Sequence, residues 1–325
     1  MPGRLSFGPW RQTVPVAGGP TQLLHGVRLS GDVEIPGAAL VEDGDVDFEV
    51  RLEGARAVDE SPPTGELVAS LDLPSVRYAA ALDGDLLTVR FFATGEFAVD
   101  LAAGTILARP APGRGEAMVP ILLAGNVLSL VLGLRGIPVL HASAVEVDGE
   151  AIAFLGPTGA GKSTAAALLC AAGGRLVTDD AARIEERDGH PNVHRGPSEL
   201  RLRGRARVLA ERFPSARVTA DERTAIEAAG AADPLTRLGA VVFPGWPRDA
   251  AALSASRVTT REALELLLRY PRVTGWLSAE HARIHFDACT RIAEAVPAFR
   301  LELPQGQLED PDLPTTLHDA LMAAR

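Results

Sequence analysis

The segment GPTGAGKS, residues 156–163, is the feature that most limits what this chain can fold into. It matches the pattern G-x-x-x-x-G-K-[ST] at every specified position. The apolar segment AIAFL before it predicts a buried strand, and the alanine-rich segment from about Gly161 to Ala172 predicts a helix. A strand, a glycine-rich loop and a helix in this order form a nest of backbone amides that binds phosphate oxygens. The alternative is a glycine-rich turn without a ligand.

Lys162 is the only lysine in the chain, although Lys and Arg together number 32. Every other basic residue among the 32 is arginine, so a lysine at position 162 is informative. A compact ammonium on a flexible stem reaches the β and γ phosphates of a nucleotide, whereas a planar guanidinium has a different geometry and more bulk. Ser163 is placed for a hydroxyl contact with Mg²⁺, and Thr164 for the α-phosphate region. The expected nucleotide-binding residues are Gly156, Pro157, Thr158, Gly159, Ala160, Gly161, Lys162, Ser163 and Thr164.

Two acidic residues follow the next predicted strand, GRLVTDD, which ends in Asp179 and Asp180. In a parallel sheet the carboxyl ends of neighbouring strands face one crevice, so both carboxylates are expected near the γ phosphate. One is suited to hold Mg²⁺ through its water shell, and the other to accept a proton from an attacking hydroxyl. The sequence leaves open which of them is the base. The alternative is a solvated turn or a helix N-cap made by paired aspartates.

The character of the chain changes near residue 117. Before it, segments such as DVDFEVRLEG and GTILARP alternate with period two and predict antiparallel strands and hairpins. A length of 325 residues exceeds what a single core usually organises. We therefore expect a β-rich N-terminal domain, residues 1–116, which helps to hold the substrate, and a catalytic domain, residues 117–325.

Composition excludes several classes of protein. A formal charge of −10 argues against a nucleic-acid partner or a membrane surface, because proteins that bind these concentrate positive charge. Cys170 and Cys289 lie in apolar helical patterns and are expected to be buried thiols, as suits a reducing cytoplasm. The N-terminal segment lacks the apolar core of a signal peptide. The apolar stretch 118–134 is short for a bilayer and contains proline, asparagine and serine, so it predicts a buried core helix.

Residues 140–184, LHASAVEVDGEAIAFLGPTGAGKSTAAALLCAAGGRLVTDDAARI, resemble the catalytic core of HPr kinase/phosphorylase. They resemble more closely its shorter relatives encoded with peptide natural-product pathways, including lasso peptide kinases. LHASAV and LVTDD are the specific parts, because many NTPases share the loop. The resemblance covers about residues 117–303. It implies an α/β P-loop kinase core, a mixed sheet with helices like the HPr kinase C-terminal domain, preceded by a β-rich part like that of the peptide-pathway relatives.

The resemblance also implies roles for single residues. Asp179 would be the catalytic carboxylate near the acceptor hydroxyl, Asp180 a supporting or metal-proximal carboxylate, and His141 a residue close to the transferred phosphoryl group. Lys162 would act with them on the phosphates. The acceptor implied is a seryl hydroxyl. For His141, a hydrogen-bonded core histidine is the alternative.

One signature departs from the family. HPr kinases carry a segment close to EIRGLG, whose glutamate helps the metal, and the corresponding stretch here is SELRLRGRAR, residues 198–207. Glu199 and Arg201 are in place, but the glycine pattern differs, so we expect a substrate other than HPr. Glu199 is a candidate metal ligand, with a solvated face as the favoured alternative. Arg201 and Arg203 are candidates for contacts with phosphate or an acidic peptide, because guanidinium pairs with both in bidentate fashion.

The expected protein is therefore an ATP- and Mg²⁺-dependent cytoplasmic kinase that transfers the γ-phosphoryl group to a hydroxyl. The favoured acceptor is a serine of a peptide or small protein in a biosynthetic pathway. A small-molecule hydroxyl kinase and a nucleotide-binding regulatory ATPase stay open as alternatives. A homo-oligomer, such as a hexamer, is suggested by the resemblance only.

Three further segments complete the expectations. Residues 216–239 are rich in small and charged residues and predict a mobile loop or lid. His281 and His285 have the i, i+4 spacing of a zinc pair but lack the adjacent glutamate, so they are expected to be ordinary helix-face histidines. TTREALELLLRY predicts a helix capped by Thr259 or Thr260.

Overall fold

The computed structural model describes residues 20–42, 44–74, 76–113, 115–247, 252–304 and 306–325. Packing divides the chain into two compact units. The first ends at Gly136 and also includes Val273–Arg283, and the second comprises Ile137–Arg272 and Ile284–Arg325. The chain changes from strands to helix near residue 116. The boundary between the two compact units lies twenty residues later, because the helical segment Gly115–Leu134 belongs to the first unit.

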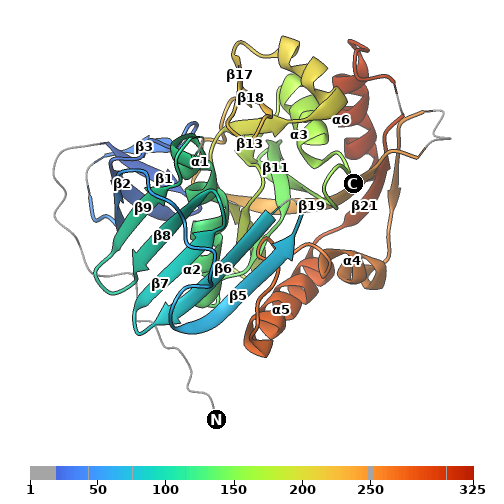
Figure 1. Ribbon diagram of the computed structural model, residues 1–325. Helices are drawn as coiled ribbons and strands as arrows, with labels where there is room; N and C mark the ends of the chain where they lie inside the picture. The colour runs from blue at the N-terminus through green and yellow to red at the C-terminus, as the bar shows by residue number, and fades with distance from the viewer. Residues whose placement is uncertain (1–19, 43, 75, 114, 248–251, 305) are drawn as a thin grey trace. The chain divides into compact units, whose positions relative to one another are not determined.

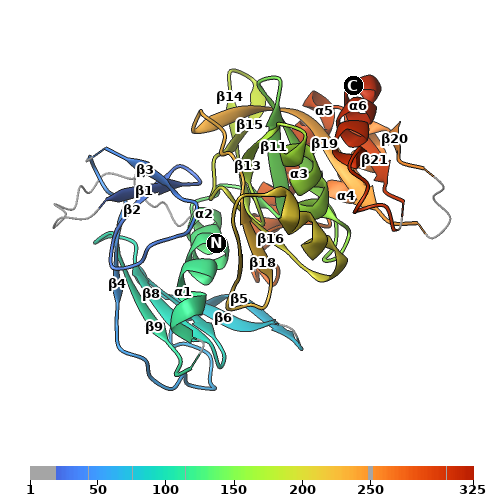
Figure 2. The same cartoon turned by 90° about the horizontal axis from the view of Figure 1, so that it is seen from above.

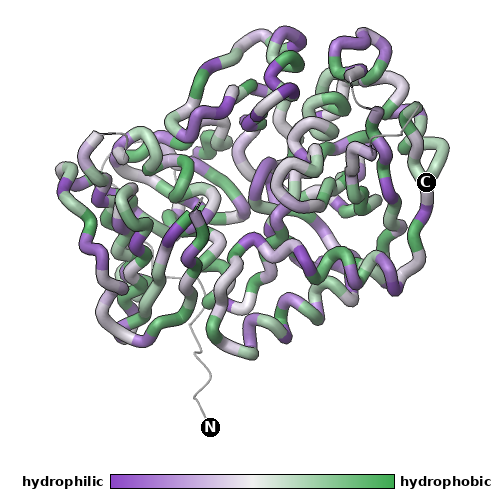
Figure 3. The backbone as a smooth tube through the Cα atoms, turned by 45° about the vertical axis from the view of Figure 1, so that its right-hand side comes forward, coloured by the Kyte–Doolittle hydropathy of each residue, from purple (hydrophilic) through white to green (hydrophobic). Residues whose placement is uncertain are grey.

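The first unit is built on a nine-stranded sheet with the order β3-β1-β2-β4-β9-β8-β7-β6-β5. β4 pairs in parallel with β2 and β9, and the other pairs are antiparallel. The backbone carries both hydrophilic and hydrophobic residues (Figure 3), and in β9 every second residue is buried. The strands are β1 (Thr21–Leu24), β2 (Val27–Gly31), β3 (Ala39–Val41), β4 (Phe48–Leu52), β5 (Glu66–Leu73), β6 (Val76–Asp83), β7 (Leu86–Phe91), β8 (Gly95–Asp100) and β9 (Thr105–Pro110).

An apolar helical segment lies along this sheet (Figure 2). It consists of α1 (Gly115–Leu122), a π-helical turn η1 (Leu123–Val127) and α2 (Leu128–Leu134). By length and composition alone, Gly115–Leu134 could cross a membrane, but 61% of its most apolar window is buried inside the structure. The Trp276 ring packs so closely on Gly133 that a Cβ there would lie 2.4 Å from the indole. The segment therefore behaves as a core helix.

The second unit is an α/β structure around a mixed sheet. The sheet has the order β10-β14-β15-β19-β12-β11-β13, and β21 joins β19 to β20. Helices α3 and α6 cover one face and α4 and α5 the other (Figure 1), each over its own apolar cluster. The strands are β10 (Val139–Leu140), β11 (Ala142–Val147), β12 (Glu150–Leu155), β13 (Arg175–Thr178), β14 (Ala182–Arg187), β15 (His190–His194), β19 (Leu235–Gly245), β20 (Ser254–Arg257) and β21 (Ala298–Glu302). The helices are α3 (Lys162–Ala171), α4 (Thr260–Leu267), α5 (Ala279–Ala295) and α6 (Leu313–Ala324).

A small antiparallel sheet, β16-β18-β17, belongs to the same unit. It consists of β16 (Glu199–Leu202), β17 (Ala216–Val218) and β18 (Thr224–Glu227), with the 3-10 helix η2 (Gly204–Arg212) after β16. Much of the segment 216–239, expected as a loop or lid, is therefore strand. The turn between β17 and β18 carries charged residues, and one of them, Arg223, lines the cavity described below.

The direction of β11 determines which strand ends lie together at one edge of the sheet. β11 pairs antiparallel with both β12 and β13, so those two strands run the same way with β11 between them. Asp148 and Gly149 form the tight β11–β12 turn with φ of 52° and 80°. The carboxyl ends of β12 and β13 thus lie at one edge of the sheet, as expected, but the amino-terminal end of β11 lies between them.

Candidate functional site

The glycine-rich loop connects the buried strand β12 to helix α3. Gly159 and Gly161 have φ of 87° and 101°, in the left-handed region that residues with a Cβ rarely adopt. A Cβ on Gly161 would lie 2.6 Å from Nε1 of Trp246, so glycine is required there for space as well. The loop amides and the N-terminus of α3 together favour an anion.

Lys162 begins α3, and its side chain turns back over the loop. Its Nζ donates to the carbonyl oxygens of Gly156 at 2.9 Å and Pro157 at 3.3 Å. The residue is 7% exposed. Burial lowers the pKa of the ammonium to about 8, although the charges of Asp179 and Asp180 act in the opposite direction. The ammonium is therefore held by neutral carbonyl groups at a position where burial disfavours its charge.

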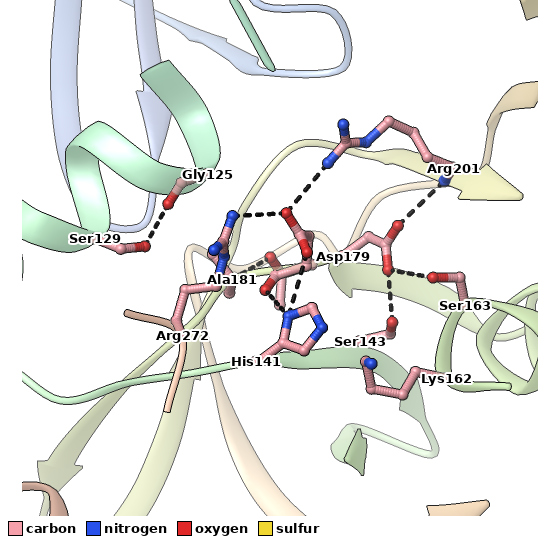
Figure 4. Close-up of polar contacts among 12 residues, drawn as sticks. Gly125, Ser129, His141, Ser143, Lys162, Ser163, Asp179, Ala181, Arg201 and Arg272 are labelled. Atoms are coloured by element: carbon pink, nitrogen blue, oxygen red, sulfur yellow. Dashed lines mark hydrogen bonds and ion pairs between the residues drawn. The ribbon is translucent and has the colours of Figure 1, made fainter. Parts of the chain in front are cut away.

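Asp179 lies at the junction of three elements (Figure 4). Its Oδ1 accepts hydrogen bonds from Ser163 at 2.9 Å and from Ser143 at 2.5 Å. Its Oδ2 accepts from the backbone amide of Arg201 at 3.1 Å. The carboxylate is thus oriented by α3, β11 and β16 at once, and it faces the hydroxyl that follows Lys162.

Asp180 points in a different direction, although it is the next residue. Its Oδ2 lies 2.8 Å from Arg272 and 3.2 Å from Arg201, and its Oδ1 lies 3.2 Å from Nδ1 of His141. Burial would raise the pKa of this carboxyl, but Arg272, His141 and Arg201 outweigh it and hold the pKa well below its ordinary value. The residue has φ of 72°, which aspartate tolerates better than most residues. Asp180 therefore acts as the centre of a buried ionic cluster.

These side chains surround a cavity of about 470 Å³. Its walls come from the glycine-rich loop, the ends of β13 and β16, helix η2 and the loop before α6. The predicted site residues that line it are His141, Thr158, Gly159, Gly161, Lys162, Ser163, Thr164, Asp179, Asp180, Arg201 and Arg203. The sequence-based candidates from four separate segments therefore meet at one place.

Four other predicted residues, Gly156, Pro157, Ala160 and Glu199, are placed differently, and the Ala160 amide donates to the carbonyl oxygen of Pro157 at 3.1 Å. Gly156 and Pro157 contribute the carbonyl groups that hold Lys162. The Glu199 side chain pairs with Arg217 of β17 in the same small sheet, and Glu199 is not among the described residues that line the cavity. Burial raises the pKa of Glu199, although Arg217 opposes this effect. Its contact with Arg217 gives Glu199 a structural role in this arrangement.

Several residues at the site were missed by sequence reasoning. Ser143 is two residues after His141, and period-two alternation would have placed both on one face of the strand. Arg272, which pairs with Asp180, and Trp246, which lines the cavity, follow a helix and a strand with no recognisable motif. Asp221, in the β17–β18 turn, forms an ion pair with Arg201 at 3.1 Å. Only Ser143 had a signal that could have revealed it.

The remaining candidates are structural. His281 stacks on Trp276 with centroids 3.8 Å apart, and His285 lies 3.3 Å from the carbonyl oxygen of Leu268. Cys170 and Cys289 are free, and burial raises the pKa of each thiol to about 12. Among the described residues, no group of three or more His, Cys, Asp or Glu side chains is arranged to hold a metal ion.

Comparison with known proteins gives distant likenesses among solved structures only. No protein-family model and no curated protein matches the chain. Among solved structures, the HPr(Ser) kinase/phosphatase from Coxiella burnetii is similar at 10% sequence identity, over 57% of this chain and 94% of that chain, with a TM-score of 0.30. The site is therefore interpreted from its own geometry.

Proposed function

We propose that this protein is a kinase that uses ATP and Mg²⁺ to phosphorylate a hydroxyl group, with a serine of a peptide or small protein as the favoured acceptor. The observation that carries the proposal is the bond between Ser163 and Asp179 beside the buried ammonium of Lys162. This arrangement supports a site in which the loop would bind an anion, the Ser163 hydroxyl would bind a cation and Asp179 would accept a proton. The resemblance to HPr kinase-like enzymes of peptide pathways supports the choice of acceptor.

The loop supplies what a polyphosphate needs. The positive φ of Gly159 and Gly161 permits a loop whose amides would bind phosphate oxygens, and the N-terminus of α3 adds a partial positive charge. Lys162 already lies over the loop, and its ammonium donates to the carbonyl groups of Gly156 and Pro157. Phosphate oxygens would give that ammonium a charged partner and offset the cost of its burial.

The residues at the site also fit Mg²⁺, which prefers hard oxygen ligands and binds proteins through few carboxylates. The Ser163 hydroxyl, with the nearby Oδ1 of Asp179, would hold the ion directly or through its water shell. Asp180 fits this task less well, because Arg201, Arg272 and His141 already occupy its oxygens. When bound, Mg²⁺ would supply positive charge to the phosphate oxygens.

Asp179 is the proposed proton acceptor. It takes the proton of the acceptor hydroxyl while that oxygen bonds to the γ phosphorus and the bond to the leaving ADP breaks with its electron pair. The hydrogen bonds from Ser143 and the Arg201 amide fix the carboxylate before substrate arrives. His141 is held by Asp180 at the edge of the same cavity, close to where the phosphoryl group would pass.

The test is transfer from Mg-ATP to a peptide acceptor. Purified protein is incubated with Mg-ATP and serine-containing peptides, and mass spectrometry follows the gain of one phosphoryl group while ADP release is measured without acceptor. A phosphorylated peptide is expected, and the product should be absent with Asp179→Asn. Phosphorylation of small hydroxyl compounds alone would indicate a small-molecule kinase. Phosphate release that needs no acceptor would indicate a regulatory ATPase.

A further inference from the structure

The cavity is positively charged in a protein whose formal charge is −10. Its charged lining comprises five cationic side chains and two carboxylates. The cationic side chains are Lys162, Arg201, Arg203, Arg205 and Arg223, and the carboxylates are Asp179 and Asp180. Such a surplus attracts anions and is costly unless an anion neutralises it.

The five cations differ in their partners. Arg201 is shared between Asp180 and Asp221, and Arg223 also pairs with Asp221 at 3.1 Å. Arg203 and Arg205 are exposed, and the guanidinium group of neither makes a hydrogen bond or ion pair with another described residue. These two guanidinium groups therefore have their donors available.

The arginines act on one another and on the loop. Burial lowers the pKa of Arg223, and repulsion from Arg201 and Arg203 lowers it further. Arg203 and Arg223 also contribute to the lowered pKa of Lys162, although burial is the main cause. The charges of Arg203 and Arg223 therefore lie close enough to the Lys162 ammonium to affect its pKa.

Asp179 is bonded to two of the segments that line this cavity. Its Oδ1 bonds to Ser163, on the side of the phosphate-binding loop, and its Oδ2 bonds to the amide of Arg201, on the side of β16. Arg203 follows two residues after that amide, and Arg205 is the second residue of the 3-10 helix η2. The unpaired arginines thus line the same cavity and follow closely in sequence the residue whose amide bonds to Asp179.

We propose that Arg203, Arg205 and Arg223 form an anion-binding subsite for the acceptor, so that the preferred acceptor is a serine flanked by carboxylate groups in a peptide. This inference rests on the proposed kinase function. The loop and Lys162 bind the donor's phosphates, and the three arginines bind the acidic side chains next to the reacting hydroxyl. Guanidinium groups suit this task because they pair with carboxylates in bidentate fashion.

The test measures binding and transfer separately. Fluorescein-labelled peptides Glu-Glu-Ser-Glu-Glu, Gln-Gln-Ser-Gln-Gln and Lys-Lys-Ser-Lys-Lys are titrated with the full chain in Mg-ADP, and binding is followed by fluorescence anisotropy. The acidic peptide should bind at least about tenfold more tightly than the neutral one, and added salt should reduce the difference. The double variant R203Q/R205Q should remove this preference, with an equal rise in KM for the acidic peptide.

A matched control removes the same charge elsewhere on the second unit. Arg187 and Arg257 are exposed and do not line the cavity, so R187Q/R257Q should behave as the wild type. Calorimetric titration with ADP shows whether the arginines act on the donor instead. A loss of ADP affinity in R203Q/R205Q, with peptide binding unchanged, would overturn the proposal, as would equal affinity for the three peptides.

The two proposals fail in different ways. If the acidic peptide binds through Arg203 and Arg205 but never gains a phosphoryl group, the anion subsite stands and the kinase function is wrong. If the neutral peptide is phosphorylated as well as the acidic one, and R203Q/R205Q does not change this, the kinase function stands and the subsite is wrong.

Discussion

Asp179 and Ser163 are joined by a hydrogen bond of 2.9 Å, although Asp179 directly follows strand β13 and Ser163 lies in the first turn of α3, sixteen residues earlier. The bond couples the carboxylate proposed to accept a proton with the hydroxyl proposed to hold Mg²⁺. The same oxygen of Asp179 also accepts from Ser143, so the carboxylate has little freedom to turn.

Asp179→Asn should lower kcat by about a hundredfold to ten-thousandfold, because the amide keeps the shape of the side chain but accepts no proton. Nucleotide affinity should change little. A Mg²⁺ titration separates two causes: a lost base leaves the half-saturating Mg²⁺ concentration unchanged, and a lost metal contact raises it. Asp188→Asn is the control, because Asp188 is an exposed turn residue with positive φ and asparagine tolerates that conformation. Wild-type kcat in Asp179→Asn would remove Asp179 from the mechanism.

Lys162 should make nucleotide binding depend on pH. Its pKa in the free protein is about 8, and a bound polyphosphate favours the charged ammonium, so binding near pH 8 should take up about half a proton. Affinity should fall as the pH rises above 8. Calorimetry in buffers with different ionisation enthalpies measures the uptake, and Lys162→Gln should bind weakly with no uptake in this range. Uptake that persists in Lys162→Gln would assign the proton to another group.

The same pKa shift predicts a trend in stability. The folded pKa of Lys162 lies below its ordinary value of 10.5, so the folded protein binds fewer protons between pH 8 and 10.5. The cost of burying the ammonium is fully present below pH 8 and is relieved as the pH rises through this range. In urea unfolding, the difference in unfolding free energy between wild type and Lys162→Gln should therefore shift in favour of the wild type from pH 8 to pH 10. A constant difference would contradict the shift.

Asp180→Asn should destabilise the second unit by about 3 kcal/mol, because it leaves the Arg272 and Arg201 guanidinium groups buried without their shared carboxylate. The pKa of Asp180 lies below its ordinary value of 3.8, so its contribution is present above pH 4 and is lost as the pH falls through the folded pKa. Urea unfolding at pH 7 and below pH 4 measures this. A difference between the two proteins that persists unchanged in acid would contradict the ionic role.

Gly161→Ala should weaken nucleotide binding at least about tenfold, because the new methyl group meets Trp246 and the residue must keep φ of 101°. Gly159→Ala is the matched control, since it has positive φ but nothing within 4 Å of an added Cβ. Its affinity should fall by less. Trp246→Ala in the Gly161→Ala background should recover part of the loss, and no recovery would show that conformation alone is responsible.

Local sequence patterns predicted the elements well and the contacts between them poorly. The loop, the flanking strand and helix α3 were predictable because each residue's neighbours in sequence determine its conformation there. The N-cap of α4 was also predicted, and Thr259 accepts from the amide of Glu262 at 3.2 Å. Arg272 was not predictable, because its partner Asp180 lies 92 residues away in the sequence and only the tertiary fold brings them together.

The pairing of strands in the sheet was also not predictable from local sequence, which led us to expect parallel neighbours beside the strand that precedes Asp179. Sequence periodicity gives the strand that precedes Asp179 but not which strand pairs beside it. In the structure β11 intervenes, and it brings Ser143 against Asp179. The small sheet was missed for a related reason: β17 is fully exposed and lacks the apolar alternation by which strands are recognised.

The reversed course of β11 has a consequence for protein engineering. Its pairing with β12 is fixed by the two-residue turn at Asp148 and Gly149. Adding or removing one residue in that turn would slip the pairing and exchange the two faces of the strand, so that an alanine methyl would replace the Ser143 hydroxyl. Anyone who transplants the glycine-rich loop onto another scaffold must therefore carry this hairpin with it at its native length.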